Sequence, residues 1–382
     1  MLRALDDLGR VTVFAPNLRD ESLAAIKLAG MTAHSETDTY LQRLVRVATA
    51  LLSRRSITYS FYRSVLPRTS ALKDYDLIFV ERITPPKPVD GIPIIYDVVD
   101  NFQQQVRQLA ITAPFPRRLG YLYDSAVIHR DILAACTRAN LTLCTTEHEA
   151  DTLTGLGVAR DKLLPYLHSS QVDVPPLTVT CGAPARSRPR RGVFHGRASY
   201  AANQSAVQYI RRHIAPRTPH WEFLVFGEGW LSSRVEPMLF MGYQSDLRLL
   251  RSADIGVFPM QASVGIQNKV LEALAAGLPV LVTPEVARGL PYHITKLLKD
   301  RIVVADAQTF GEVLEEARDS LSPSTEAEHR FADVYAQLLK RSRSELKAIV
   351  EQLTSSHPRT YRNAVENEKS HPAKQRKGRP IE

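Results

Sequence analysis

Short apolar runs alternate with longer helical patterns along most of this 382-residue chain, and this alternation limits the folds it can adopt. The strand candidates of the first half are rich in branched and aromatic side chains and lie at residues 11–15, 77–80, 94–96 and 141–145. Helical patterns fill the gaps at residues 21–28, 41–52 and 125–137. Strands that alternate with helices predict a parallel sheet covered by helices on both faces.

A stretch without periodicity interrupts this alternation. Residues 171–191 contain Pro175, Pro176, Pro184 and Pro189, a composition typical of an interdomain linker. The alternation then restarts, with strand candidates at residues 192–195, 221–226, 255–258 and 280–283. The helical patterns between them lie at residues 203–213, 246–252 and 268–276. The chain is long enough for two domains that each bury their own core.

We therefore predict an α/β protein with two Rossmann-like, doubly wound domains. The predicted parts are an N-terminal domain at 1–170, a linker at 171–191, a C-terminal domain at 192–335, a C-terminal helix at 336–354 and a disordered basic tail at 355–382. The residues before the first strand candidate look helical. We therefore expect the first domain to be truncated at its start, without its opening strand and glycine-rich turn.

The formal net charge of +9 favours anionic partners, such as a phosphorylated ligand or a phospholipid surface. Much of the excess lies in Arg186, Arg188, Arg190 and Arg191 and in the tail, where such runs are usually solvated. These runs lack interleaved aromatic residues, which disfavours nucleic-acid binding. Cys136, Cys144 and Cys181 have no metal-ligand spacing and fit a reducing cytoplasm, so we expect no metal site.

The segment 265–279 contains the strongest candidate for a ligand site. The loop residues Gly265, Ile266, Gln267 and Asn268 lead into the predicted helix, whose positive end can bind a phosphate through backbone N–H groups. One turn later, the Glu272 carboxylate can accept hydrogen bonds from two sugar hydroxyls. The alternative is a surface helix with a Lys269–Glu272 pair worth only tenths of a kcal/mol.

Other predicted strand ends carry residues suited to the same ligand. Gly196 with Arg197, Gly227 with Glu228, and Gly242 with Tyr243 all follow strand candidates, and ligands bind at these ends in doubly wound domains. Glycine permits close approach of the backbone, Arg197 offers a planar fork to phosphate oxygens, and Tyr243 can lie beside a base. Tight turns, a solvated arginine and a packed tyrosine are the alternatives.

These residues fall in an order that resembles a known family. Phe194-His195-Gly196-Arg197 with Asn203, Gly227-Glu228-Gly229, Gly242-Tyr243, the 268–279 segment and Gly289-Leu290 resemble the C-terminal domain of glycosyltransferase family 4 (group 1), close to bacterial exopolysaccharide-associated sugar transferases. In the first domain the resemblance is looser and rests on Tyr75-Asp76, Asp97-Val98-Val99-Asp100 and Thr145-Thr146-Glu147-His148-Glu149.

The resemblance implies a GT-B fold, in which the two domains face each other across a cleft. It implies a retaining transfer from a nucleoside-diphosphate sugar to a glycan or polyprenyl-linked acceptor in cell-surface polysaccharide synthesis, without a cofactor or a required metal. Gly196, Gly227, Tyr243, residues 265–268 and Glu272 would bind the nucleotide sugar. Within this set, Glu272 matches the family glutamate that holds the ribose, while Arg197 matches the basic residue that holds the diphosphate.

The sequence departs from the family pattern at two positions. Val264 replaces the first glutamate of the family motif, and Ala201-Ala202-Asn203 stand where a lysine usually follows the Gly-Arg pair. We expect Lys269 to supply the missing positive charge at the start of the helix. With Arg197 and Lys269, Asp100 completes the predicted catalytic set as an acceptor-side contact or base, although a turn or capping aspartate is an equal alternative.

Two other functions fit the same features. One is a catalytically silent relative that binds nucleotide or scaffolds the pathway, and the other is a GT-B nucleotide-sugar epimerase. No apolar run is long enough to span a membrane, so we expect a cytoplasmic protein, with peripheral contact at the inner face of the plasma membrane as a further option.

Overall fold

A computed structural model of the chain describes most of both predicted domains. The described residues are 12–16, 32–36, 40–57, 72–73, 75–81, 91–98, 106–107, 110, 115–167, 189–244, 246–261, 265–318 and 320–356. The predicted helix at residues 21–28, Asp100, Val264 and the basic tail beyond residue 356 lie outside them.

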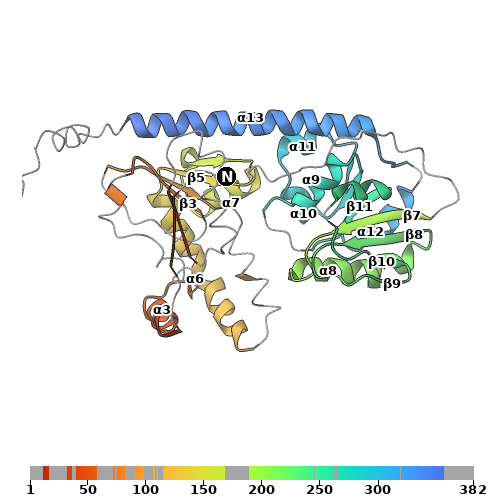
Figure 1. Cartoon of the computed structure of the whole chain (residues 1–382), viewed down its shortest axis with the longest axis horizontal. Helices are drawn as coiled ribbons and strands as arrows, with labels where there is room; N and C mark the ends of the chain where they lie inside the picture. Colours follow the sequence, from red (N-terminus) through yellow and green to blue (C-terminus); the bar gives the residue numbers. More distant parts are fainter. Residues whose placement is uncertain are drawn as a thin grey trace, which may run out of the picture.

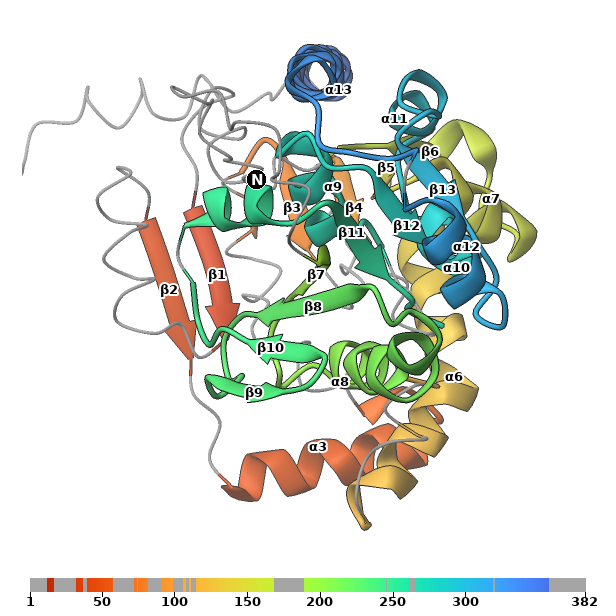
Figure 2. The same cartoon turned by 90° about the vertical axis from the view of Figure 1, so that its right-hand side faces the viewer.

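The second domain is built on a seven-stranded sheet of order β13-β12-β11-β7-β8-β10-β9 (Figure 2). Its strands are β7 (Arg190–His195), β8 (Trp221–Phe226), β9 (Ser233–Val235), β10 (Met238–Phe240), β11 (Ile255–Phe258), β12 (Val280–Val282) and β13 (Ile302–Val304). All neighbours are parallel except β9, which runs antiparallel to β10. The strand order reverses at β7, which pairs with β8 on one side and with β11 on the other.

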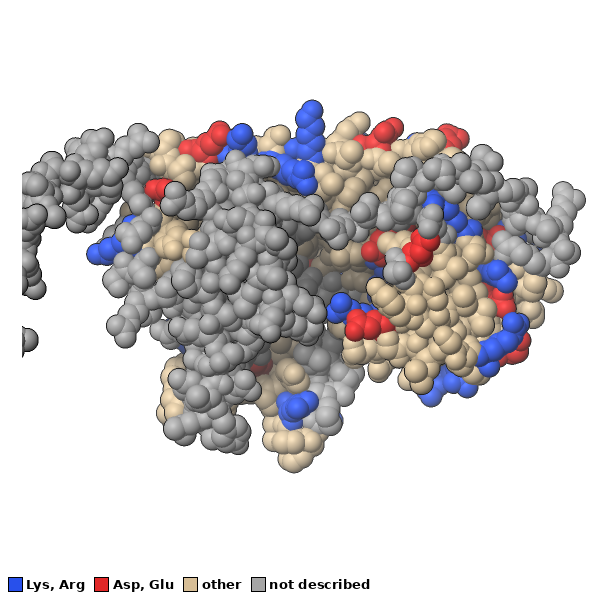
Figure 3. Space-filling model, viewed as in Figure 1, with Lys and Arg blue, Asp and Glu red and all other residues tan. Residues whose placement is uncertain are grey.

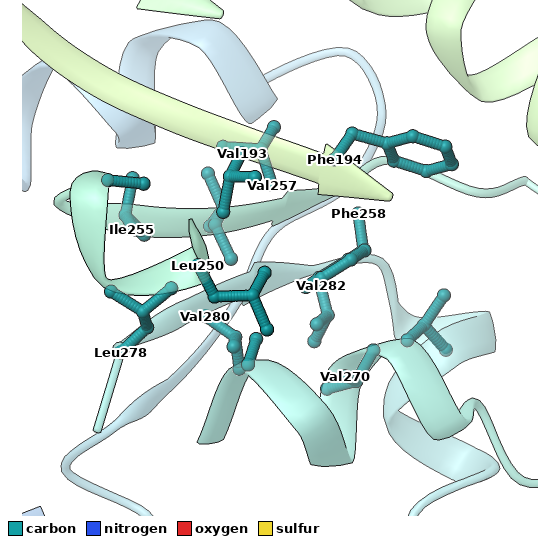
Figure 4. Close-up of a cluster of buried hydrophobic side chains, with 14 of the residues drawn as sticks. Val193, Phe194, Leu250, Ile255, Val257, Phe258, Val270, Leu278, Val280 and Val282 are labelled. Atoms are coloured by element: carbon teal, nitrogen blue, oxygen red, sulfur yellow. The ribbon is translucent and has the colours of Figure 1, made fainter. Parts of the chain in front are cut away.

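Helices cover both faces of this sheet. They are α8 (Ala201–Tyr209), continued by η4 (Ile210–Ile214) and η5 (Ala215–Arg217), then η6 (Leu247–Ser252), α9 (Asn268–Ala275), α10 (Pro284–Arg288), α11 (Tyr292–Leu297) and α12 (Phe310–Glu316). Every residue of β8 and β11 is buried, as expected for a parallel sheet with two covered faces. Val193, Val257, Val270 and Val282 meet in the core between β7, β11, β12 and α9 (Figure 4).

The first domain contains a four-stranded parallel sheet of order β3-β4-β5-β6. Its strands are β3 (Ile78–Glu81), β4 (Ile94–Asp97), β5 (Leu141–Cys144) and β6 (Leu163–Pro165), and the accompanying helices are α3 (Tyr40–Leu52), α6 (Arg117–Arg138), α7 (Glu147–Gly155) and η3 (Arg160–Lys162). Two further strands, β1 (Thr12–Pro16) and β2 (Thr32–Glu36), form a separate parallel pair. In doubly wound sheets of the common strand order 3-2-1-4-5-6, the first strand of the domain lies in the middle of the sheet and joins its two halves. Among the described strands of this protein, none occupies such a position between the β1-β2 pair and the sheet that begins with β3.

One long helix, α13 (Thr325–Ser355), runs along both domains (Figure 1). Its first half packs Phe331 and Tyr335 into the core of the second domain. Its second half packs Leu346 and Val350 against the sheet of the first domain. The segment 336–354, expected as a separate C-terminal helix, is therefore the second half of α13.

The linker ends earlier than the composition suggested. β7 begins at Arg190, so Arg190 and Arg191 are strand residues and not linker residues. The buried Asp254 carboxylate accepts the backbone N–H of Arg191 at 2.8 Å and forms an ion pair with the Arg190 guanidinium at 3.2 Å. These arginines are thus fixed by acidic partners, although their sequence alone resembles a solvated run.

A buried ion pair joins α13 to the second domain, and its loss should destabilise the protein. The Arg251 guanidinium in η6 lies 2.6 Å from Glu328 of α13, with side-chain exposures of 6% and 8%. We expect Arg251→Met to lower the free energy of unfolding by about 3 kcal/mol or more, because Glu328 keeps a buried charge without its ion-pair partner. Urea unfolding measures the free energy of unfolding of this variant. The control is Arg341→Ala, which breaks the exposed Arg341–Glu345 pair on the same helix and should lower the free energy of unfolding by less than about 1 kcal/mol. Equal losses in both variants would contradict the prediction.

Candidate functional site

Three loops meet at the carboxyl end of the second sheet, where β7, β8 and β10 end. The N–H of Gly196 donates to the Phe226 carbonyl at 3.0 Å, and the N–H of Ala198 donates to the Glu228 carbonyl at 2.7 Å. The N–H of Gly227 donates to the Gly242 carbonyl at 2.9 Å. These backbone bonds bring the three glycine-containing turns predicted from the sequence into one cluster.

Two of these turns pack so closely that they require glycine. Gly227 has a φ of 138°, and a Cβ there would lie 2.3 Å from the Gly196 carbonyl oxygen. Gly196 has a φ of 147°, and its Cβ would lie 2.6 Å from Nδ2 of Asn203. The indole of Trp230 donates to the same Gly196 carbonyl at 2.8 Å. The backbone between β7 and α8 is therefore held from several sides.

Arg197 and Tyr243 extend from this cluster toward solvent. The Arg197 side chain is 75% exposed and forms an ion pair with Glu228 at 3.0 Å. An exposed pair of this kind is weak, so the guanidinium can exchange Glu228 for a phosphate at small cost. Tyr243 is 69% exposed, so its ring face is open to a planar ligand.

The loop before α9 opens at the point where the strand order of the sheet reverses. Gly265 and Gln267 are buried, Ile266 is half-buried and Asn268, the first helical residue, is exposed. The side chain of the N-cap residue Gln267 makes no capping hydrogen bond to this helix. Ligands of doubly wound domains bind at this position.

Lys269 lies beneath the turn that carries Arg197. Its amine donates a hydrogen bond to Oδ1 of Asn203 and lies 3.5 Å from the sulfur of Met260 and 5.1 Å from the centre of the Phe194 ring. The Asn203 amide in turn donates to the Arg197 carbonyl at 2.9 Å. Burial lowers the pKa of Lys269 to about 8, and the nearby Glu272 carboxylate opposes part of that shift.

Glu272 faces the same region from the next turn of α9 and has a partner that sequence reasoning did not assign. Its Oε2 lies 2.6 Å from Nε2 of His195, the last residue of β7. The Glu272 side chain is 20% exposed and that of His195 is 7% exposed. The available signal was a polar side chain directly after the apolar pair Val193 and Phe194, at the end of the strand.

The structure thus brings the predicted residues of the second domain together at one edge of its sheet. Charged side chains of both signs also gather on the part of this domain that faces the first domain (Figure 3). Asp100 cannot be placed relative to this site, because it lies outside the described residues. The position of Val264 is outside them as well.

Comparisons with known proteins agree with this architecture. Residues 189–320 match the family model described as "Glycosyl transferases group 1". The structure resembles HepE from Anabaena, solved with UDP, at 11% identity and a TM-score of 0.56, over 92% of this chain and 95% of that one. It also resembles a glycosyltransferase from Rickettsia africae, at 10% identity and a TM-score of 0.54, over 91% and 92% of the two chains.

A third similar structure is the N-terminal domain of trehalose-6-phosphate phosphatase from Candida albicans, at 12% identity and a TM-score of 0.51, over 90% and 89% of the two chains. No curated protein matches the chain significantly in sequence. At these identities the solved structures establish the fold, and the predicted α/β GT-B fold with two doubly wound domains is confirmed.

Because Gly227 lies directly against the Gly196 backbone, adding one methyl group at position 227 should strongly destabilise the fold. We expect Gly227→Ala to lower the free energy of unfolding by more than about 3 kcal/mol, since it adds a steric overlap with backbone to an unfavourable φ. Gly157→Ala is the matched control, because Gly157 also has a positive φ of 101° but has nothing within 4 Å of its Cβ position. The control should lose about 1–2 kcal/mol in the same urea titration. A loss at Gly227 no larger than at Gly157 would show that the two turns separate easily.

Proposed function

We propose that this chain, whose residues 189–320 form a group 1 glycosyltransferase domain, transfers a sugar from a nucleoside-diphosphate sugar to a glycan or lipid-linked acceptor. The observation that carries the proposal is the convergence of Arg197, Lys269, Glu272 and the start of α9 where the strand order reverses. Two cations beside a positive helix end suit a diphosphate, and a carboxylate suits the hydroxyls of a sugar. The similar protein HepE has been crystallised with UDP-glucose, which supports a nucleotide sugar as the ligand.

The proposed reaction exchanges one bond at the anomeric carbon of the sugar for another. The bond to the diphosphate oxygen breaks, and the nucleoside diphosphate leaves with its electron pair. Arg197, Lys269 and the start of α9 stabilise the negative charge that develops on this leaving group. An acceptor hydroxyl forms the new glycosidic bond and gives its proton to a base, a role for which Asp100 of the first domain is the candidate.

The finer features of the reaction follow from the resemblance found in the sequence. We propose that the anomeric configuration is retained and that the acceptor belongs to cell-surface polysaccharide synthesis. We also propose that no metal is required, since the two cations and the helix end can neutralise the diphosphate charge. A silent nucleotide-binding protein and a nucleotide-sugar epimerase are the competing functions.

Peripheral membrane contact is the second part of the proposal, and a surface of the first domain supports it. α3 and the start of α6 lie together, joined by a hydrogen bond from Tyr123 to the Ala50 carbonyl at 3.3 Å (Figures 1 and 2). Six large apolar side chains are exposed there: Val45, Leu51, Leu52, Phe115, Leu119 and Leu122. We call them the apolar tip.

The charge around the apolar tip fits an anionic lipid surface. Four arginines with described side chains lie in or beside these two helices, Arg54, Arg55, Arg117 and Arg118, and residues 40–57 and 115–123 contain no aspartate or glutamate. Apolar side chains beside arginines bind the headgroup region of anionic bilayers. Among the described helices, none is long and apolar enough to cross a membrane, so this contact would be peripheral.

The main experiment separates the three candidate functions. The purified protein is incubated with UDP-, GDP-, ADP- and dTDP-sugars, with and without a polyprenyl-phosphate-linked sugar as acceptor. Release of nucleoside diphosphate together with acceptor elongation supports transfer. Interconversion of the nucleotide sugar without an acceptor supports an epimerase, and binding without turnover supports a silent relative.

The lowered pKa of Lys269 predicts how nucleotide affinity depends on pH. With a pKa of about 8 in the free protein, Lys269 loses its charge as the pH rises above 8, whereas a bound diphosphate would keep it protonated. Affinity for UDP should therefore be highest below pH 8 and fall above it, by up to about tenfold per pH unit. Titration calorimetry between pH 7 and 9.5 measures the decline.

Lys269→Met should bind UDP at least about tenfold more weakly at pH 7 and lack this decline, because its side chain carries no charge at any pH. Lys296→Met is the control, since Lys296 is an exposed lysine of α11 outside the site, and it should behave as the wild type. An unchanged pH dependence in Lys269→Met would assign the titration to another group.

The apolar tip predicts a specific loss of vesicle binding. Full-length protein should sediment with phosphatidylglycerol vesicles and far less with phosphatidylcholine vesicles. The double variant Leu52→Glu/Leu119→Glu should lower the fraction bound at least about tenfold, because two apolar contacts become two repulsive charges. Leu231→Glu changes an exposed leucine (85%) of the second domain and should leave binding unchanged. Equal binding of all three proteins would exclude the tip as the contact surface.

A further inference from the structure

His195 occupies a position in the site that allows its ring very little movement. It is the last residue of β7, and its side chain is 7% exposed. The imidazole stacks on Phe226, with ring centroids 5.2 Å apart and an interplanar angle of 16°. Phe258 contacts it edge-on, with the centroids 6.1 Å apart. Aromatic rings on two sides therefore fix the direction in which the nitrogens point.

The two ring nitrogens have different surroundings, which assigns the proton. Nε2 lies 2.6 Å from Oε2 of Glu272, whereas Nδ1 is buried and has no hydrogen-bond partner. A proton on Nδ1 would be a buried donor without an acceptor, which costs free energy. We take a buried Nδ1 without a proton to cost less. A neutral imidazole with its proton on Nε2 satisfies the contact, and it donates this proton to the carboxylate.

This hydrogen bond limits the orientations open to Glu272. A glutamate side chain rotates about several bonds, and holding it for a ligand costs conformational entropy at the moment of binding. A rigid imidazole that fixes Oε2 leaves Oε1 and the remaining lone pair of Oε2 for a ligand. Glu272 belongs to α9 and His195 to β7, so their hydrogen bond also joins the ligand-facing side of α9 to the end of the central strand.

The fixed carboxylate suits a particular chemical group. Two neighbouring hydroxyls on one ring can each donate to a carboxylate whose plane is fixed, and a ring that lacks one of them leaves a lone pair unused. A ribose carries such a pair at its 2′ and 3′ positions, whereas a 2′-deoxyribose does not. Discrimination is largest when the group that reads the hydroxyl is preorganised and shielded from water, and the Glu272 side chain is 20% exposed and held by His195.

We propose that His195 is a positioning residue that orients Glu272, so that the site selects ribonucleoside over 2′-deoxyribonucleoside diphosphates. The inference rests on the proposed function, since it assumes that a nucleotide binds beside α9. His195 itself touches no substrate in this proposal and acts only through the carboxylate.

The test compares the binding of UDP with that of 2′-deoxy-UDP, and of GDP with 2′-deoxy-GDP, by titration calorimetry on the full chain. The wild type should prefer the ribonucleotide at least tenfold. His195→Phe keeps an aromatic ring in the stack and removes the N–H, and it should reduce the preference to threefold or less by weakening ribonucleotide binding alone. His195→Gln restores an N–H near the position of Nε2 and should recover most of the preference.

A merely structural role for His195 would give a different result, because it would weaken both nucleotides and inorganic pyrophosphate alike. A preference retained in His195→Phe overturns the inference while leaving the proposed function intact. If neither ribonucleotide binds the wild type, the proposed function fails instead.

A second measurement needs no variant at that position and applies if His195→Phe does not fold. Imidazole ¹⁵N signals of the wild-type protein should include a neutral histidine protonated on Nε2 that shifts on addition of UDP and less on addition of 2′-deoxy-UDP. The absence of any histidine with this behaviour overturns the inference.

Discussion

The pairing of β7 with β11 determines where this protein can bind a ligand. These strands are far apart in the sequence, and the chain crosses from one half of the sheet to the other before it forms the second of them. The helices that follow them, α8 and α9, therefore diverge to opposite sides and leave their amino ends near one another. Arg197, Lys269, His195 and Glu272 come together only because this pair of strands is central.

Burial in that region has opposite effects on two neighbouring polar groups. It makes the charged form of Lys269 costly, so the lysine gains from any anion that arrives nearby. It makes the hydrogen bond between His195 and Glu272 stronger, since the His195 side chain is 7% exposed and little water reaches its side of the bond. The site thus combines a cation that benefits from a ligand with an anion that is already held in place.

Much of the fold could be predicted from the sequence because it depends on local patterns. The predicted strands at residues 221–226 and 255–258 have the observed bounds of β8 and β11, since fully buried parallel strands are nearly continuous apolar runs, with Glu222 the one charged residue in β8. The end of the linker could not be predicted, because the partners of Arg190 and Arg191 are Asp254 and Glu222, far along the chain. The role of His195 was missed for the same reason, because only the folded sheet places β7 beside α9.

The continuity of α13 has a consequence for how the two halves of the molecule can move. A helix of 31 residues is about 46 Å long and resists bending, and each of its halves is anchored in a different core. Between Tyr335 and Leu346 none of its residues is fully buried, although Leu338 and Leu339 still pack against the second core and Ser342 accepts a hydrogen bond from the Leu167 N–H at 3.4 Å. A change of the angle between the domains must therefore bend α13 or release one of its two anchors.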